Sequence, residues 1–144
     1  MSGFFGLGIT LLATARRQGK ISRLWSLFDG FATWSFPNAI TDTSPRTLSA
    51  GSQVQVYSGG TGTLAGVLTG TGLLTKVNAG EITISNAGNT GWSGGLTING
   101  GAVRVGSATA LGTGTVTLNS GTTLYLQGFT PANTIVNNGG TVVP

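Results

Sequence analysis

The sequence predicts a mainly β protein: a parallel β-helix, or solenoid, of roughly 20-residue coils, preceded by a partly helical N-terminal arm. Three observations predict this fold class. Short runs alternate apolar and polar residues, Asn and Gly separate the runs, and the whole unit recurs at a near-constant interval. Because one such unit is too small to bury its own apolar face, the units must stack on one another.

The composition excludes much chemistry. The 144 residues include no Cys, no His and only three Asp+Glu, which are Asp29, Asp42 and Glu81. Without Cys and His there is no disulfide framework, no thiolate zinc site and no histidine general base. We therefore expect a protein that is not an enzyme, with no catalytic residues, no cofactor and no metal. Disordered chains combine high net charge with low hydropathy. This chain has few charged residues and a mean hydropathy of +0.25, so its composition is that of a folded protein.

The chain divides into two unlike parts. Residues 1–46 hold five of the six Phe, two of the three Trp and most of the charge, whereas residues 47–144 hold 21 of the 26 Gly. This step predicts an anchoring or assembly segment over 1–46 and a β-helical repeat domain over 47–144. A polar, Pro-containing linker, residues 43–46, marks the boundary.

The N-terminal part has apolar residues at helical spacing from Gly8 to Phe28, with basic residues on another side. This spacing predicts one helix, or two short helices broken near Gly19. The favoured interpretation of the basic side is a solvated face on a helix packed against its own or a neighbouring subunit. A membrane-surface segment and a nucleic-acid contact are the less favoured alternatives. The expected assembly or anchor residues are Arg16, Arg17, Lys20, Arg23, Trp25, Phe28 and Trp34.

A signal peptide is not predicted at the start of the chain. The apolar run from Phe4 to Ala15 is followed by Arg16 and Arg17, and no positive side chain precedes it. A secretory signal has the reverse order.

The repeat is clearest in the second half of the chain. Four alternating runs end in an asparagine, and these asparagines lie 21, 20 and 19 residues apart: Asn78, Asn99, Asn119 and Asn138. Asparagines at equivalent turns are expected to form a ladder of side-chain hydrogen bonds. Ser52 to Tyr57 is a further expected strand, and Thr61 to Gly72 is expected to hold one imperfect coil. An antiparallel sandwich is the alternative, but the near-constant interval favours the solenoid.

Five stretches resemble the passenger-associated repeat of bacterial autotransporters: GTGLLTK (70–76), ITISNA (82–87), GGLTINGG (94–101), RVGSA (104–108) and ALGTG (110–114). The match covers roughly residues 70–118, with a weaker continuation to 143. The resemblance implies a right-handed parallel β-helix displayed outside a cell, without catalytic residues. The sequence departs from the family at Val77, where a Gly is usual, at the acidic Glu81, in the lack of a C-terminal barrel segment, and throughout residues 1–46.

Similar β-helical repeats occur in fibres and decorations of bacteriophage particles, and an unlike N-terminal arm suits that setting better. We therefore expect a structural protein of an extracellular assembly: a virion decoration, fibre or tail protein. The alternative is a cell-surface adhesin module. The expected partners are further copies of the chain (a homotrimer, by analogy with phage fibres), other structural proteins of the assembly, and a host-surface glycan or protein. Nucleic acid and membrane are not expected partners. Trp92 and Tyr125 are expected to be a loop-packing Trp and an outward strand Tyr.

Overall fold

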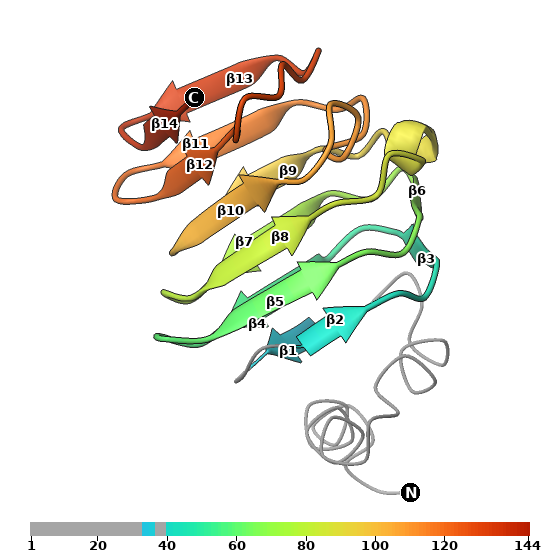
Figure 1. The fold of residues 1–144 in the computed structure, drawn as a ribbon, viewed down its shortest axis with the longest axis horizontal. Helices are drawn as coiled ribbons and strands as arrows, with labels where there is room; N and C mark the ends of the chain where they lie inside the picture. Colours follow the sequence, from blue (N-terminus) through green and yellow to red (C-terminus); the bar gives the residue numbers. More distant parts are fainter. Residues whose placement is uncertain (1–32, 37–39) are drawn as a thin grey trace, which may run out of the picture.

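The repeating runs of the sequence form the rungs of a parallel β-solenoid (Figure 1). The computed structural model describes residues 33–36 and 40–144. Within this part the chain is mainly β, and the predicted parallel solenoid is confirmed. The predicted helical segment over residues 8–28 lies outside the described residues.

Two six-stranded parallel sheets make the long walls of the solenoid. The first sheet contains, in spatial order, β1 (Thr33–Phe36), β4 (Ser52–Val56), β7 (Leu74–Val77), β9 (Leu96–Ile98), β11 (Val116–Asn119) and β13 (Ile135–Asn138). The second sheet contains β2 (Ile40–Asp42), β5 (Thr61–Leu64), β8 (Glu81–Ile84), β10 (Ala102–Val105), β12 (Thr123–Tyr125) and β14 (Thr141–Val143).

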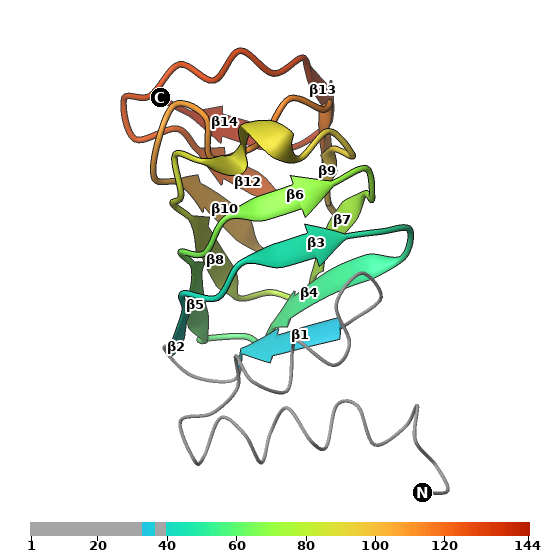
Figure 2. The same ribbon diagram turned by 90° about the vertical axis from the view of Figure 1, so that its right-hand side faces the viewer.

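A short third side completes the first coils (Figure 2). It is formed by β3 (Arg46–Leu48) and β6 (Leu68–Gly70), and the 3-10 helix η2 (Asn89–Gly91) follows at the next level. A bridge between Gly70 and Trp92 joins that level to β6. The alternating runs of the sequence do not predict this third side.

The coils differ slightly in length. In register, Ser52 pairs with Leu74 whereas Thr123 pairs with Thr141, so a coil takes between 18 and 22 residues. The strands stay aligned because the extra residues are placed in the connections between them. Strand pairing, rather than exact sequence spacing, therefore sets the repeat.

Side-chain alternation divides core from surface. In the first sheet, Leu74, Leu96 and Val116 are in register and fully buried. The next residue of each strand points outward, which gives the row Thr75, Thr97 and Thr117. Successive side chains of a strand point to opposite faces, so stacking converts a period of two along the chain into continuous apolar rows. Each fully buried aliphatic side chain contributes roughly 1.5–3 kcal/mol.

The solenoid begins upstream of residue 47. Strands β1 and β2 precede the expected domain boundary, yet they pair in parallel with β4 and β5 of the same sheets. The predicted linker, residues 43–46, is the corner that leads from β2 into β3. The change in composition near residue 46 reflects where aromatic and charged side chains occur, whereas strand pairing depends on the backbone. Composition and strand pairing therefore place the boundary differently, and the first described coil begins before residue 47.

Close backbone contacts between coils give a first prediction. A Cβ atom at Gly94 would lie 1.8 Å from the carbonyl oxygen of Gly72 in the preceding coil. We expect Gly94→Ala to lower the free energy of unfolding by about 3 kcal/mol, because backbone must move to accommodate it. Gly59→Ala is the control: Gly59 has a φ of +78° but nothing within 4 Å, so its cost is about 1 kcal/mol from backbone strain alone. Urea denaturation measures both, and equal losses would contradict the prediction.

Candidate functional site

The expected anchor residues lie mostly outside the described residues. This holds for Arg16, Arg17, Lys20, Arg23, Trp25 and Phe28. Trp34 lies in β1, where its backbone pairs in register with Val54. Their role in anchoring or assembly stays a prediction.

Three of the four expected ladder asparagines are joined by side-chain hydrogen bonds. The amide of Asn119 donates to Oδ1 of Asn99 (2.5 Å), and the amide of Asn138 donates to Oδ1 of Asn119 (3.2 Å). Asn78 behaves differently: it has a left-handed φ of 65°, and its backbone carbonyl accepts a hydrogen bond from Lys76. The described ladder therefore starts at Asn99 and runs along the turn between the two large sheets.

The ladder gives a second prediction. Asn119→Ala removes both described ladder bonds, so we expect it to lower the free energy of unfolding by about 1 kcal/mol. Thr117→Ala, on the same strand but outside the ladder, is the control for lost β-propensity. Thermal denaturation compares the two. A loss for Asn119→Ala no larger than that for Thr117→Ala would show that the ladder does not stabilise the turn.

A lysine lies in the middle of an apolar row. Lys76 is fully buried and in register with Val54 before it and Ile98 after it, both fully buried. Its Nζ donates to the carbonyl oxygens of Val77 (2.8 Å), Asn78 (2.7 Å) and Gly100 (3.0 Å). Burial lowers the pKa of Lys76 to about 8. The ammonium thus joins two coils at their corner, and the left-handed Asn78 contributes one of the carbonyls that receive it.

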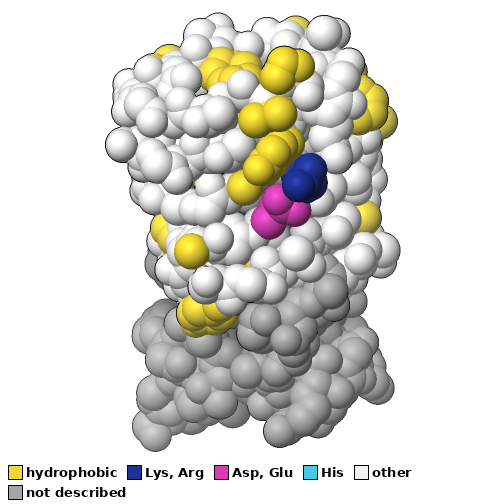
Figure 3. Space-filling view, turned by 60° about the vertical axis from the view of Figure 1, so that its left-hand side comes forward, with side chains coloured by type: hydrophobic (Ala, Val, Ile, Leu, Met, Phe, Trp, Pro, Cys, Tyr) yellow, Lys and Arg dark blue, Asp and Glu magenta, His cyan; other side chains and the backbone are white. Residues whose placement is uncertain are grey.

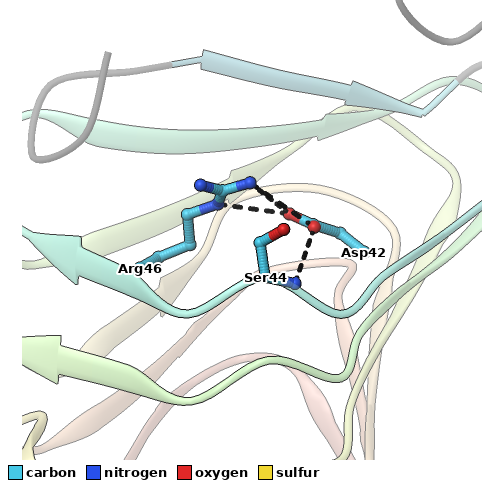
Figure 4. A network of polar contacts seen from close by, with 3 residues as sticks. All are labelled: Asp42, Ser44 and Arg46. Atoms are coloured by element: carbon cyan, nitrogen blue, oxygen red, sulfur yellow. Dashed lines mark hydrogen bonds and ion pairs between the residues drawn. The ribbon is translucent and has the colours of Figure 1, made fainter. Parts of the chain in front are cut away.

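A buried ion pair lies at the corner between β2 and β3 (Figure 4). Nε and an Nη of Arg46 each lie 3.3 Å from Oδ2 of Asp42, and both side chains are only 1% exposed. Oδ1 of Asp42 also accepts a hydrogen bond from the backbone N–H of Ser44 at 3.0 Å. The Asp42 carboxylate therefore binds both the side chain of Arg46 and the backbone of Ser44 within the corner. Removing one partner of such a pair is costly, because the other charge stays buried.

Asn89 and Trp92 fasten the third side. The side chain of Asn89 accepts from the N–H of Leu68 and donates to the carbonyl of Ala110, both at 2.7 Å, so it connects three successive coils. Trp92 is fully buried, and its Nε1–H donates to the carbonyl of Gly72 at 3.0 Å. These two side chains replace the strand pairing that ends with β6.

One charged pair lies on the outer face of the second sheet. Nε of Arg104 donates to Oε1 of Glu81 at 2.7 Å, and its guanidinium lies 4.2 Å above the ring centre of Tyr125. The hydrogen bond to Glu81 raises the pKa of Arg104, which keeps the guanidinium charged. Figure 3 shows a basic and an acidic group side by side on one face of the molecule, next to a stripe of hydrophobic side chains. The contact joins three neighbouring coils on the surface, as the outward position of Tyr125 allows.

The two buried charged sites, at Lys76 and at Asp42 with Arg46, were not predicted from the sequence, although the alternation of apolar and polar residues contained a signal for each. Lys76 lies two residues after the inward Leu74, so the pattern assigns it an inward position. Asp42 pairs in register with the buried Leu64 and is likewise inward. The partners of these charges could not be predicted from the sequence. The three acceptors of Lys76 are backbone carbonyls, and the contact between Asp42 and Arg46 depends on how the chain turns the corner between β2 and β3.

Within residues 33–36 and 40–144, no group of three or more His, Cys, Asp or Glu side chains is placed to hold a metal ion. In the same ranges no helix has the length and apolar character needed to cross a membrane. No family model, no curated protein and no solved structure matches the chain. The candidate functional elements are those that the described residues define: the coil-joining polar side chains and the outer face of the second sheet.

Proposed function

We propose that this chain is a non-enzymatic structural subunit of an extracellular assembly, and that a bacteriophage virion is the setting that suits it best. There it serves as a decoration, fibre or tail protein. The observation that carries the proposal is the way in which buried charged side chains are used. Lys76, Asp42 and Arg46 are all engaged in contacts that hold corners and join coils. A stack fastened in this way suits a rigid spacer.

The proposal assigns different tasks to the two parts of the chain. The solenoid projects, and residues 1–32 attach it to further copies of the chain and to other structural proteins. Support comes from β1, which continues directly from that segment into the first sheet through pairing with β4. A mechanical force on residues 1–32 would therefore act on the backbone hydrogen bonds between β1 and β4. The low charge of the chain, 7% of residues, suits a protein held in an assembly, since weakly charged surfaces promote association.

A substitution in the N-terminal segment tests the proposal. We expect the full chain to sediment as a defined oligomer, and the double variant Trp25→Ser, Phe28→Ser to sediment at lower mass with an unchanged β-rich circular dichroism spectrum. Leu73→Ser is the matched control, because Leu73 is a large apolar side chain, 42% exposed on the solenoid. An oligomer unaffected by the double variant would contradict the anchor role. A full chain that is a folded monomer favours the alternative, a cell-surface adhesin module.

A further inference from the structure

Two ladder asparagines are followed by the same two residues, because Asn-Gly-Gly occurs at residues 99–101 and again at 138–140. The nitrogen of the glycine after an asparagine can attack the side-chain carbonyl carbon and close a five-membered ring. Glycine hinders this attack least, since it has no Cβ and its backbone rotates freely. The local sequence therefore gives Asn99 and Asn138 similar reactivity, and a difference between them must come from the fold.

The two attacking nitrogens are in different environments. Among the described residues, the N–H of Gly100 has no hydrogen-bond acceptor. The N–H of Gly139 instead donates to Oδ1 of Asn137 at 3.1 Å, and Gly140 donates to the same oxygen at 2.7 Å. Attack by Gly139 therefore requires that a hydrogen bond be broken first, whereas attack by Gly100 does not.

The side chain of Asn99 is placed to accept the attack. Asn99 follows β9 directly and is exposed, and its Oδ1 accepts a hydrogen bond from the amide of Asn119 in the next coil. Attack on the side-chain carbon moves negative charge onto Oδ1. A hydrogen bond to a charged acceptor is roughly twice as strong as one to a neutral acceptor, so the ladder bond strengthens as the ring forms. Asn138 differs, because its Nδ2, the leaving nitrogen, is held by Oδ1 of Asn119 at 3.2 Å.

A positive charge lies close to the attacking nitrogen. Nζ of Lys76 donates to the carbonyl oxygen of Gly100 at 3.0 Å. The nitrogen of this same glycine must lose its proton during the attack, and a nearby positive charge favours the deprotonated form. The turn after β9 thus combines an unbound nucleophile, a donor on the oxygen that becomes charged, and a cation beside them.

We infer that Asn99 is a site of spontaneous deamidation, activated by the amide of Asn119, and that Asn138 is spared. The nitrogen of Gly100 forms a bond to Cγ of Asn99 and gives its proton to water. The bond between Cγ and Nδ2 then breaks, and Nδ2 takes up a proton and leaves as ammonia. Water opens the cyclic imide at either carbonyl, which leaves aspartate or isoaspartate. Water is the sole co-reactant, and no electrons are transferred.

The products act on the two polar contacts that join this coil to its neighbours. Each event lowers the formal net charge of +4 by one. An aspartate oxygen can still accept from Asn119, so this product preserves the ladder. Isoaspartate inserts the side-chain methylene into the main chain before Gly100, which shifts the carbonyl that Lys76 binds. The inference does not depend on the proposed function, since it concerns the turn alone.

Peptide mapping of aged protein tests the inference, with Asn138 as an internal control. Trypsin cleaves after Lys76 and Arg104, and residues 105–144 contain no Lys or Arg, so the two asparagines fall in separate peptides. The full chain is incubated at neutral pH, folded and in urea, and mass spectrometry with fragmentation follows the loss of each amide. In the folded protein Asn99 should react about fivefold faster than Asn138, the factor that corresponds to one hydrogen bond of about 1 kcal/mol. In urea the two rates should be equal. Equal rates in the folded protein, or a faster loss at Asn138, would overturn the inference.

Asn119→Ala tests the activation by the ladder. It removes the donor to Oδ1 of Asn99, so the rate at Asn99 should fall about fivefold. Thr117→Ala, on the same strand, keeps the ladder and should keep the wild-type rate. Circular dichroism verifies that both variants are folded. If Asn99 reacts in Asn119→Ala as fast as in the wild type, or faster, Asn119 does not activate it.

Discussion

Replacing Lys76 with methionine should lower the free energy of unfolding by about 3 kcal/mol, even though it places an apolar side chain in an apolar row. The reason is the three carbonyl oxygens of Val77, Asn78 and Gly100, which Nζ satisfies at 2.7–3.0 Å. Methionine fills a similar volume but donates no hydrogen bond. A buried acceptor left unsatisfied costs about 1–3 kcal/mol. Here three part-buried carbonyl oxygens lose their donor together, and we expect this loss to exceed the gain from removing a buried charge.

Ile98→Met is the matched control for the lysine substitution. Ile98 occupies the same row one coil further on, is equally buried and has no polar partner to lose. Its cost should stay under about 1.5 kcal/mol, as for a volume-conserving exchange. Chemical denaturation of the two variants and the wild type measures the difference. A Lys76→Met variant as stable as Ile98→Met would show that the carbonyls find water or other donors, and that the ammonium does not hold the corner.

The same lysine should make stability depend on pH. The pKa of Lys76 is about 8 in the folded protein, against the ordinary lysine value of 10.5, so between these values the unfolded chain binds more protons. Unfolding free energy therefore rises with pH across this window, because the folded state no longer holds a desolvated charge. The wild type should gain stability relative to Lys76→Met from about pH 8 to about pH 10.5. A constant difference across that window would contradict the lowered pKa.

Replacing Asp42 with asparagine should also lower the free energy of unfolding by about 3 kcal/mol. The exchange preserves shape and the oxygen that accepts from Ser44, but removes the negative charge 3.3 Å from the Arg46 guanidinium. Breaking a buried ion pair at one partner costs about 3–5 kcal/mol, because the remaining charge stays in a poorly solvated place. Loss of this corner should also loosen β2 and β3, which flank it.

A double-mutant cycle checks the ion pair. Asp42→Asn with Arg46→Met removes both charges, and its loss in unfolding free energy should be smaller than the sum of the two single losses by about 1–3 kcal/mol. Denaturant titration of the four proteins gives the coupling energy. If the two single losses simply add, Asp42 and Arg46 do not stabilise each other, and their ion pair does not contribute to the free energy of unfolding.

Much of the solenoid was predictable because alternation and turn residues carry it. The asparagines at 99, 119 and 138 identified the turn between the two large sheets, and the runs around them became β9 to β14. The third side was not predictable, since in the described chain its strand occurs only in β3 and β6 and the 3-10 helix η2 takes its place at the next level. A segment that recurs only once gives no sequence interval to recognise, and Asn89 and Trp92 act through contacts with neighbouring coils.

The start of the solenoid was misplaced for a related reason. Thr33–Phe36 contains two aromatic residues and reads as part of the aromatic segment, yet it pairs with β4 over four residues. Charged residues gave a second difficulty. A lysine or aspartate on a strand is usually assigned to the solvated face, and only the register with buried Val54 or Leu64 reveals the inward position.

We propose that the chain is a self-associating structural subunit, and the mass of the 144-residue chain in solution shows whether it is. Sedimentation equilibrium over a wide range of protein concentration is the measurement, with circular dichroism to verify the β-rich fold. We expect one defined multiple of the 14.4 kDa chain that persists on dilution. A well-folded monomer at every concentration would contradict it.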